Sequence, residues 1–166
     1  YGGGGIMPDL YVPLDTTTYT NYYRQLAAQS CINQTALKWL NDHRKQLVKQ
    51  YNINAYRKAR ARQQEGKDYD LADLRSGFEL FKQEFTIPQD MIDLLLAKAK
   101  EAKIEAPDSI RQASMPLLKT QLKALIARDL WDISNYFELV NPANEIYRQG
   151  LQALKDEKLF ENIQIK

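Results

Sequence analysis

The side chains that could act as nucleophiles in this 166-residue chain are five serines: Ser30, Ser76, Ser109, Ser114 and Ser134. A serine nucleophile needs a base within hydrogen-bond reach, and in many hydrolases a glycine-flanked elbow holds it. No such elbow surrounds any of the five. Because all five occur in helical or capping contexts, where serine is favoured, we expect them to cap helices or to lie on solvated helix surfaces.

The single histidine and the single cysteine add little further chemistry. His43 lies in the charged stretch NDHRKQ, and no serine or cysteine has a sequence signature that would pair with it. One histidine and one cysteine, without HExxH or CxxC spacing, do not make a zinc motif. We expect His43 to face solvent or to pack its ring edge-on, and Cys31 to be a small buried hydrophobe. The sequence therefore predicts no catalytic residue, no metal ligand and no cofactor site in this chain.

Three pairs of aspartates recur at helical spacing, and each pair has a structural explanation. Asp90 falls in the first turn of an expected helix, where the helix dipole favours negative charge. Asp132 stands four positions after Arg128, at the spacing of a salt bridge. We therefore expect structural roles rather than acid–base catalysis for the three pairs, which are Asp70/Asp73, Asp90/Asp93 and Asp129/Asp132.

A short basic run is the strongest local charge feature. Four positive side chains in six residues could attract phosphates or anionic lipid headgroups. Acidic residues follow at once, and the whole chain carries 23 Lys+Arg against 21 Asp+Glu, a net charge of +2. A nucleic-acid binder usually has a high pI and a basic face, so we expect a solvated surface and no nucleic-acid partner. The run comprises Arg57, Lys58, Arg60 and Arg62.

Apolar residues recur at spacings of three and four after Thr16, which is typical of amphipathic helices. Asn33–Thr35 offers caps for a helix, residues 55–64 form a weaker helix, and residues 66–70 have the composition of a loop. Four expected stripes are Tyr19, Tyr22, Tyr23, Leu26 and Ala27; Leu37, Leu40, Leu47, Val48 and Tyr51; Leu71, Leu74, Phe78, Phe81 and Phe85; and Met91, Leu94, Leu95, Ala99 and Ala102.

The longest stripe begins after Pro116 and continues to Phe137. Thr86 and Gln89 match a capping box for the helix before it. In the last helix, which carries Ile146, Tyr147, Leu151 and Leu154, Asn141 suits the N-cap and Pro142 the first helical position. About six helices joined mostly by short loops predict a mainly α protein, an irregular helical bundle. No apolar run approaches the ~20 residues that span a bilayer.

The first residues do not fit this helical pattern. Residues 6–14 suit a short strand, and Pro8 and Pro13 would confine that strand to a sheet edge. A lone strand is not independently stable, and the sequence supplies no second one. Gly2–Gly5 precede it, and each glycine held in a fixed conformation costs about 0.5–1 kcal/mol relative to alanine. We expect an orphan β segment that needs a sheet which this chain does not supply.

The segment GGGGIMPDLYVPLD resembles the last strand segment of the catalytic domain in carboxyl-terminal processing (tail-specific) serine proteases. In that family a Gly-rich turn leads into Gly-Ile-x-Pro-Asp, which Gly5–Asp9 match here. The helical remainder is similar to the C-terminal extension of the Bacteroides-type branch, most clearly at YYRQL (Tyr22–Leu26) and LKALIARDLW (Leu122–Trp131). The resemblance spans essentially the whole chain.

The resemblance implies a serine-type peptidase that cleaves protein substrates near their C-termini with a Ser/Lys dyad and without a metal or cofactor. Family order places the PDZ domain, the serine and the lysine upstream of the Gly-rich turn, so we expect them before Tyr1 and expect this part to be inactive alone. Residues 1–15 would then be the end of the catalytic core, and residues 16–166 a C-terminal helical domain. The resemblance also implies a periplasmic or cell-envelope location.

The partners expected on this basis are the protease core, protein or peptide substrates, and a second copy in a homo-oligomer. The helical domain would pack against the core, shape access to the active site or mediate assembly. Two other interpretations stay open. One is a freestanding helical interaction module, since the chain has ten Tyr, five Phe and two Trp. The other is a polyanion-binding domain that uses the basic run.

Overall fold

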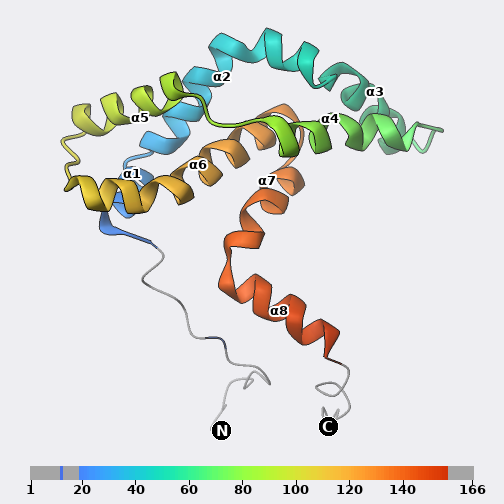
Figure 1. Ribbon diagram of the computed structural model, residues 1–166. Helices are drawn as coiled ribbons and strands as arrows, with labels where there is room; N and C mark the ends of the chain where they lie inside the picture. The colour runs from blue at the N-terminus through green and yellow to red at the C-terminus, as the bar shows by residue number, and fades with distance from the viewer. Residues whose placement is uncertain (1–11, 13–18, 157–166) are drawn as a thin grey trace, which may run out of the picture. The chain divides into compact units, whose positions relative to one another are not determined.

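Figure 1 shows the computed structural model of the chain, in which residue 12 and residues 19–156 are described. The prediction of a mainly α, irregular helical bundle is confirmed, with eight α-helices in the described part rather than about six. The orphan strand predicted at residues 6–14 lies, except for Val12, outside the described residues. The helices are α1 (Asn21–Ala28), α2 (Cys31–Gln50), α3 (Ile53–Gln64), α4 (Leu71–Glu84), α5 (Gln89–Glu101), α6 (Asp108–Leu130), α7 (Ile133–Val140) and α8 (Glu145–Lys155), with a 3-10 turn η1 (Asn141–Ala143) between the last two.

The chain divides into two compact units. Residues 19–140 form the larger unit, called the bundle below, and it contains α1 to α7. The described part of the smaller unit consists mainly of η1 and α8. The boundary predicted at residue 15 lies outside the described residues.

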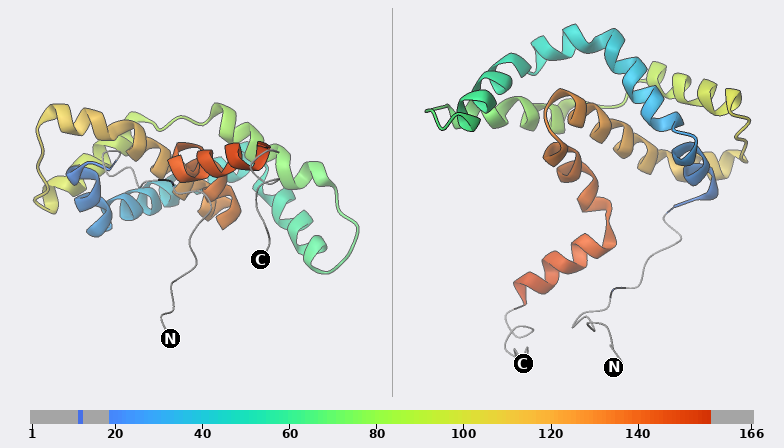
Figure 2. Two further views of the ribbon diagram at one scale, coloured as in Figure 1. Left: turned by 90° about the horizontal axis from the view of Figure 1, so that it is seen from below. Right: turned by 180° about the vertical axis from the view of Figure 1, so that it is seen from behind.

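The long helix α2 packs against both α5 and α6 (Figures 1 and 2). The short helix α1 contacts α2 and α6 at one end, and α3 pairs with α4 in a hairpin at the other. After α6 the chain turns sharply, and α7 packs back on α6. Helices far apart in sequence therefore surround one shared interior.

That interior is built from the predicted stripes. All side chains that are buried in the described part belong to residues 22–130, and α7 and α8 contribute none. Burial of each large apolar side chain contributes roughly 1.5–3 kcal/mol, so this cluster supplies the main driving force for folding. The most deeply buried large apolar side chains are Leu26, Leu40, Tyr51, Ile53, Phe78, Phe81, Met91, Leu95, Leu118, Leu122 and Ile126.

Gly77 allows α4 to approach the end of α2 more closely than any other residue would. An ideal Cβ at Gly77 would lie 2.1 Å from the carbonyl oxygen of Tyr51. That oxygen belongs to the backbone, so no side-chain rotation could relieve the overlap. Phe81, one turn after Gly77, stacks edge-on against the Tyr51 ring with centroids 5.2 Å apart. The glycine thus fixes the contact between the hairpin and the rest of the bundle.

Several helices end or begin in the left-handed region. Ser30 and Asn52 take positive φ at the joints between α1 and α2 and between α2 and α3. Gly66 follows α3 with φ +68°, and Lys103 takes the corresponding position after α5 with φ +55°. The residue after each donates back to the helix, from Lys67 N to Arg62 O and from Ile104 N to Ala99 O, both 2.9 Å. Both ends are Schellman-type C-caps, one built with glycine and one with lysine.

Some predicted boundaries are wrong. α2 begins at Cys31, so Asn33–Thr35 lies inside it, and Thr35 is buried. The capping box of Thr86 and Gln89 does not form, because Pro88 holds the N-cap position without a side-chain bond. The last helix is capped by Asn144, which accepts from Tyr147 N at 3.3 Å, while Asn141 and Pro142 form the 3-10 turn.

The longest predicted stripe is interrupted. α6 begins at Asp108 and includes Pro116, although an interior proline removes one helix hydrogen bond. The C-cap of α6 is Trp131, where φ −114° and ψ −94° end the helical periodicity. Phe137, which the sequence analysis placed in the same stripe, therefore lies on α7 and is 50% exposed. Leu37 and Leu71, also predicted in apolar stripes, are exposed as well. A stripe marks apolar positions, but only a facing helix buries them.

None of the helices in the described part of the chain combines the length and the apolar character that a bilayer span requires.

Candidate functional site

The serines do not assemble a nucleophile. Ser114 is buried in α6 and donates to the carbonyl of Ile110 at 2.7 Å, and Ser134 contacts Asp132. Among the described residues, no serine hydroxyl hydrogen-bonds a lysine or His43. Ser30, Ser76 and Ser109 are exposed, as expected for solvated positions.

Ser114 has a partner that the sequence did not indicate. Its Oγ lies 2.6 Å from Oγ1 of Thr20, the N-cap of α1. Because Ser114 uses its proton on the Ile110 carbonyl, the Thr20 hydroxyl is the donor between them, and Thr20 in turn accepts from Tyr23 N at 3.1 Å. We call Thr20, Tyr23, Ile110 and Ser114 the N-terminal anchor, because they tie the point where the chain enters α1 to the middle of the bundle.

A hollow lies beside the N-terminal anchor, with a volume of about 500 Å³. Its walls come from α1, α5, the loop after α5 and α6. Tyr22 lies in the apolar part, and its burial raises the pKa of its phenol, while the nearby Arg111 guanidinium acts in the opposite direction. Lys100, Glu105 and Arg111 bring both signs of charge to the hollow, so it favours no simple anion or cation.

One of the two alternatives predicted for His43, that its ring packs edge-on, is wrong. Its ring stacks face to face on Trp39, with centroids 4.1 Å apart and planes 15° from parallel. Nδ1 lies 2.9 Å from the Trp39 carbonyl, which can only accept, so Nδ1 carries the proton. Nε2 lies 4.0 Å from Asp90 Oδ2, and Trp39 Nε1 donates to the same oxygen at 2.9 Å. The arrangement joins α2 to the first turn of α5 and leaves no nucleophile for His43 to activate.

Cys31 is buried, as predicted, at the start of α2. Its thiol contacts the backbone carbonyls of Gln29 and Lys98 at 3.9 and 4.0 Å. Groups of three or more His, Cys, Asp or Glu side chains that could hold a metal do not occur among the described residues. The described part of the chain therefore offers no ligand cluster for a metal ion.

The aspartate pairs have separate structural roles. Asp70 caps α4 by accepting from Ala72 N at 2.8 Å, and Asp90 lies in the first turn of α5, as predicted. The predicted salt bridge between Arg128 and Asp132 is wrong, because Arg128 pairs with the adjacent Asp129 at 2.9 Å and Asp132 faces Arg60 at 3.4 Å. The turn after α6 redirects Asp132 toward α3.

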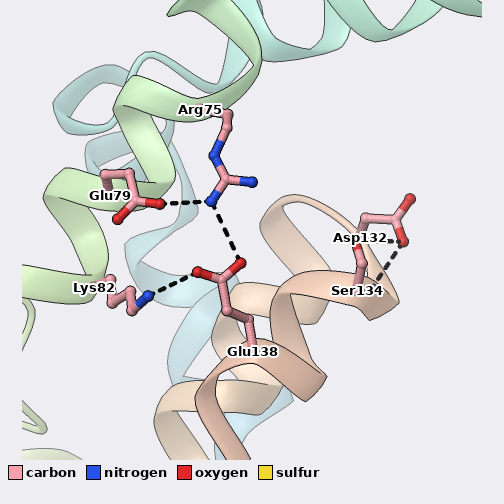
Figure 3. Close-up of polar contacts among 6 residues, drawn as sticks. All are labelled: Arg75, Glu79, Lys82, Asp132, Ser134 and Glu138. Carbon is pink, nitrogen blue, oxygen red and sulfur yellow. Dashed lines mark hydrogen bonds and ion pairs between the residues drawn. The ribbon is translucent and has the colours of Figure 1, made fainter. Parts of the chain in front are cut away.

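Asp132 also caps the start of α7. Its Oδ1 accepts from Ser134 N at 3.1 Å and from Ser134 Oγ at 3.4 Å (Figure 3). The backbone hydrogen bond from Ser134 lowers the pKa of the Asp132 carboxyl. Asp132 is therefore held as a carboxylate at a helix start, where the helix dipole also favours it.

The basic run is partly occupied within the chain. Arg60 donates to Gln63 at 2.6 Å and faces Asp132, and Arg62 donates to the Asp68 carbonyl at 2.6 Å. Arg57 and Lys58 are exposed on α3. The four positive charges thus do not form one free basic face.

An ion-pair network joins α4 and α7, and the sequence analysis did not predict it. Glu138 on α7 accepts from Lys82 at 2.7 Å and lies 3.6 Å from Arg75, which also binds Glu79 at 2.7 Å (Figure 3). The hydrogen bond to Glu138 raises the pKa of the Lys82 ammonium. Glu138 and its partners are more than 50 positions apart, so helical spacing within one element could not reveal the contact.

Lys123 holds the end of α4 from outside that helix. Its Nζ donates to the carbonyls of Lys82 and Phe85 at 2.9 and 2.6 Å and lies 5.5 Å from the Phe81 ring centroid. Burial lowers the pKa of this ammonium. A lysine with a lowered pKa can serve as a base, but here its donors are spent on helix carbonyls, so its role is to cap α4.

Residues 69–132 match a family of unknown function, DUF8443. The matched stretch runs from just before α4 to the turn after α6, and so includes Gly77, Lys123 and Ser114. The match covers less than half of the chain, and the family description names no activity.

Comparison with curated proteins and comparison with solved structures found no match. The geometry of the described residues is therefore the remaining guide. It provides the N-terminal anchor, the polar contacts of Lys123 and Glu138 between helices, and a hollow of mixed charge.

Proposed function

We propose that this chain is the C-terminal part of a serine-type carboxyl-terminal processing peptidase, with residues 1–15 closing the catalytic core and residues 16–166 forming a helical domain. The observation that carries the proposal is the run Gly2–Asp15, whose Gly-Ile-x-Pro-Asp resembles the end of that family's catalytic domain. The catalytic serine and lysine belong to the polypeptide ahead of Tyr1. The proposed location is the periplasm or cell envelope.

The N-terminal anchor supports this proposal. A chain that leaves a catalytic core and enters a helical domain needs a firm joint if the domain is to keep one position relative to the core. Thr20 provides such a joint, since its hydroxyl caps α1 and bonds Ser114 in α6 at the same time. The proposed role of the domain is to pack against, regulate or assemble the enzyme.

The test is to express the complete polypeptide encoded by the open reading frame and to assay cleavage of a protein substrate with an unstructured C-terminal tail. We expect tail cleavage by the complete chain, loss of cleavage when the upstream serine is replaced by alanine, and none from residues 1–166 alone. A complete polypeptide that has no serine and lysine upstream and cleaves no tail would overturn the proposal.

The role of the helical domain is tested with the same polypeptide. Ser114→Ala breaks the N-terminal anchor, and Ser109→Ala changes an exposed serine in the same helix and serves as the control. We expect the first variant, and not the second, to alter cleavage or stability of the complete enzyme. If cleavage and stability are unchanged both in the Ser114 variant and in a chain lacking residues 16–166, the domain has no role in the protease.

A freestanding helical interaction module is the second candidate, and the exposed apolar side chains of α7 and α8 favour it. Ile133 and Phe137 on α7 are 52% and 50% exposed. The reading frame separates the two candidates, because a module of this kind needs no peptidase ahead of Tyr1. The polyanion interpretation has less support, since Arg60 and Arg62 are engaged within the chain.

A further inference from the structure

The hollow beside the N-terminal anchor has the size and the lining of a small-molecule site. Its volume of about 500 Å³ falls within the roughly 300–1,000 Å³ of such sites, which are mostly apolar and hold a few polar groups. All of its walls belong to the bundle, in α1, α5, the loop after α5 and the start of α6. The apolar walls are mainly aliphatic, from Leu96, Ala99, Ile104 and Ala106, and so suit an aliphatic side chain.

Tyr22 brings a hydroxyl to the hollow that the described part of the chain does not use. The residue lines the hollow and is only 3% exposed. Its phenol forms no hydrogen bond with any described residue. A side-chain hydroxyl in so buried a residue normally has a hydrogen-bond partner. The Tyr22 phenol is therefore available to a polar group of a ligand.

The charged side chains around the hollow are of both signs and are largely unpaired. Lys100 and Arg111 are positive, and Glu105 is negative. Neither Lys100 nor Glu105 forms an ion pair with another described residue. Arg111 gives one nitrogen to Asp108, which leaves most of the donors of its guanidinium for other partners. Arg111 also lies near the Tyr22 phenol, where it opposes the rise in pKa that burial causes.

We infer that this hollow is a binding site for a free apolar α-amino acid of about the size of leucine. The carboxylate of the ligand accepts from Arg111 and from the Tyr22 hydroxyl, and its ammonium pairs with Glu105. Its aliphatic side chain lies against Leu96 and Ile104. A zwitterion matches both signs of charge at the hollow, whereas a simple anion or cation would match only one. The inference does not depend on the proposed function, because every residue of the site belongs to the bundle.

The test is a titration of residues 1–166 with L-leucine, followed through the amide chemical shifts by NMR. We expect saturable shifts at the residues that line the hollow. Leucinamide lacks the carboxylate and N-acetyl-leucine lacks the ammonium, so each should bind ~10-fold or more weakly, because each loses a charge-assisted hydrogen bond. The absence of saturable shifts up to about 10 mM leucine would overturn the inference.

Single substitutions assign the two charged partners. Arg111→Gln should weaken leucine binding ~10-fold or more, and Arg128→Gln, in the same helix but outside the hollow, is its control. Glu105→Gln should weaken leucine binding by a similar factor without weakening the binding of N-acetyl-leucine. Its control is Glu101→Gln, at an exposed position that does not line the hollow. Both control variants should bind leucine as the wild type does.

Tyr22→Phe removes only the hydroxyl. Because that hydroxyl has no partner in the described part of the chain, the variant should resist urea at least as well as the wild type, yet bind leucine ~3–10-fold more weakly. Leucine affinity that is unchanged in both Tyr22→Phe and Arg111→Gln would overturn the inference. Equal binding of leucine and N-acetyl-leucine would overturn it in favour of a peptide C-terminus, which presents a carboxylate without an ammonium.

Discussion

The hydroxyl oxygens of Thr20 and Ser114 lie 2.6 Å apart, although the two residues are 94 positions apart in the chain. Thr20 caps α1 and Ser114 is buried in α6, so one short hydrogen bond joins the start of the bundle to its longest helix. The bond sits where the chain arrives from the segment that resembles a protease core.

The first prediction concerns this bond. Thr20→Ala removes a helix cap and should lower the free energy of unfolding by about 1 kcal/mol. Ser114→Ala leaves the Thr20 donor without its buried acceptor and should cost about 1 kcal/mol as well. Both substitutions remove the same hydrogen bond. The double variant should therefore lose about 0.5–1 kcal/mol less stability than the two single variants lose together. Urea unfolding of residues 1–166 measures the cycle, and strictly additive losses would contradict the bond.

The second prediction concerns Gly77. Gly77→Ala would place a Cβ 2.1 Å from the Tyr51 carbonyl oxygen, so the backbone must shift. We expect a net loss of about 1–3 kcal/mol in the free energy of unfolding, despite the better helix propensity of alanine. Gly150→Ala in α8 is the matched control, because a Cβ there meets nothing within 4 Å. Circular dichroism measures helix content, which should not fall in the control. Equal losses in the free energy of unfolding at Gly77 and Gly150 would refute the close contact.

The third prediction concerns the two residues with positive φ that follow α3 and α5, Gly66 and Lys103. Lys103 occupies a left-handed conformation that costs a non-glycine residue about 1 kcal/mol or more, whereas Gly66 takes it without strain. Lys103→Gly should therefore raise the melting temperature and stabilise by about 0.5–1 kcal/mol, and Gly66→Ala should destabilise by about 1 kcal/mol. Thermal unfolding measures both, and changes of the same sign would show that the two helix ends do not share the Schellman geometry.

The fourth prediction concerns alkaline pH. Burial raises the pKa of the Tyr23 phenol to about 12, with Tyr136 and Tyr19 adding to the effect. The unfolded phenol ionises near pH ~10, so between these pH values the unfolded state has lost a proton that the folded state keeps. The free energy of unfolding should therefore fall as the pH rises from about 10 toward 12.

Tyr23→Phe should make this alkaline loss shallower than in the wild type. Urea unfolding at pH 8, 10 and 11 provides the comparison. Burial lowers the pKa of Lys123, which contributes a change of opposite sign just below pH ~10.4, but this contribution is common to wild type and variants and cancels. An identical pH slope in Tyr23→Phe and wild type would show that the phenol is not desolvated.

The fifth prediction concerns the network in Figure 3. Glu138→Gln removes the carboxylate that pairs with Lys82 and Arg75, and should cost about 0.5–1 kcal/mol at low salt, since exposed pairs contribute little. In ~1 M salt the cost should shrink, because the screening length falls to about 3 Å. Glu65→Gln, whose partner Lys67 is two residues away, is the control and should change stability very little. A cost that is insensitive to salt would indicate packing rather than charge.

Much of the fold was predictable because periodicity is a local property. The spacing of Phe78, Phe81 and Phe85 predicts one buried helix face, and all three are buried. The limits of local reasoning appear at Leu37 and Leu71, which share the spacing but lie exposed. Burial depends on what faces a residue, and the neighbours of a helix are not encoded within its own window of sequence.

The candidate site was less predictable for the same reason. The N-terminal anchor, the Lys123 cap and the Glu138 network were missed, since each joins residues at least 38 positions apart.

The sequence by itself determined that residues 19–156 are mainly helical, that the charges of the chain nearly cancel and that apolar residues recur in helical stripes. Tertiary structure decided where the longest stripe breaks at Trp131, which stripes are buried, and which distant polar groups meet. The physical reason is that helix formation follows from spacing along the chain. Packing follows from surfaces that approach through space, as Gly77 and the Tyr51 carbonyl do.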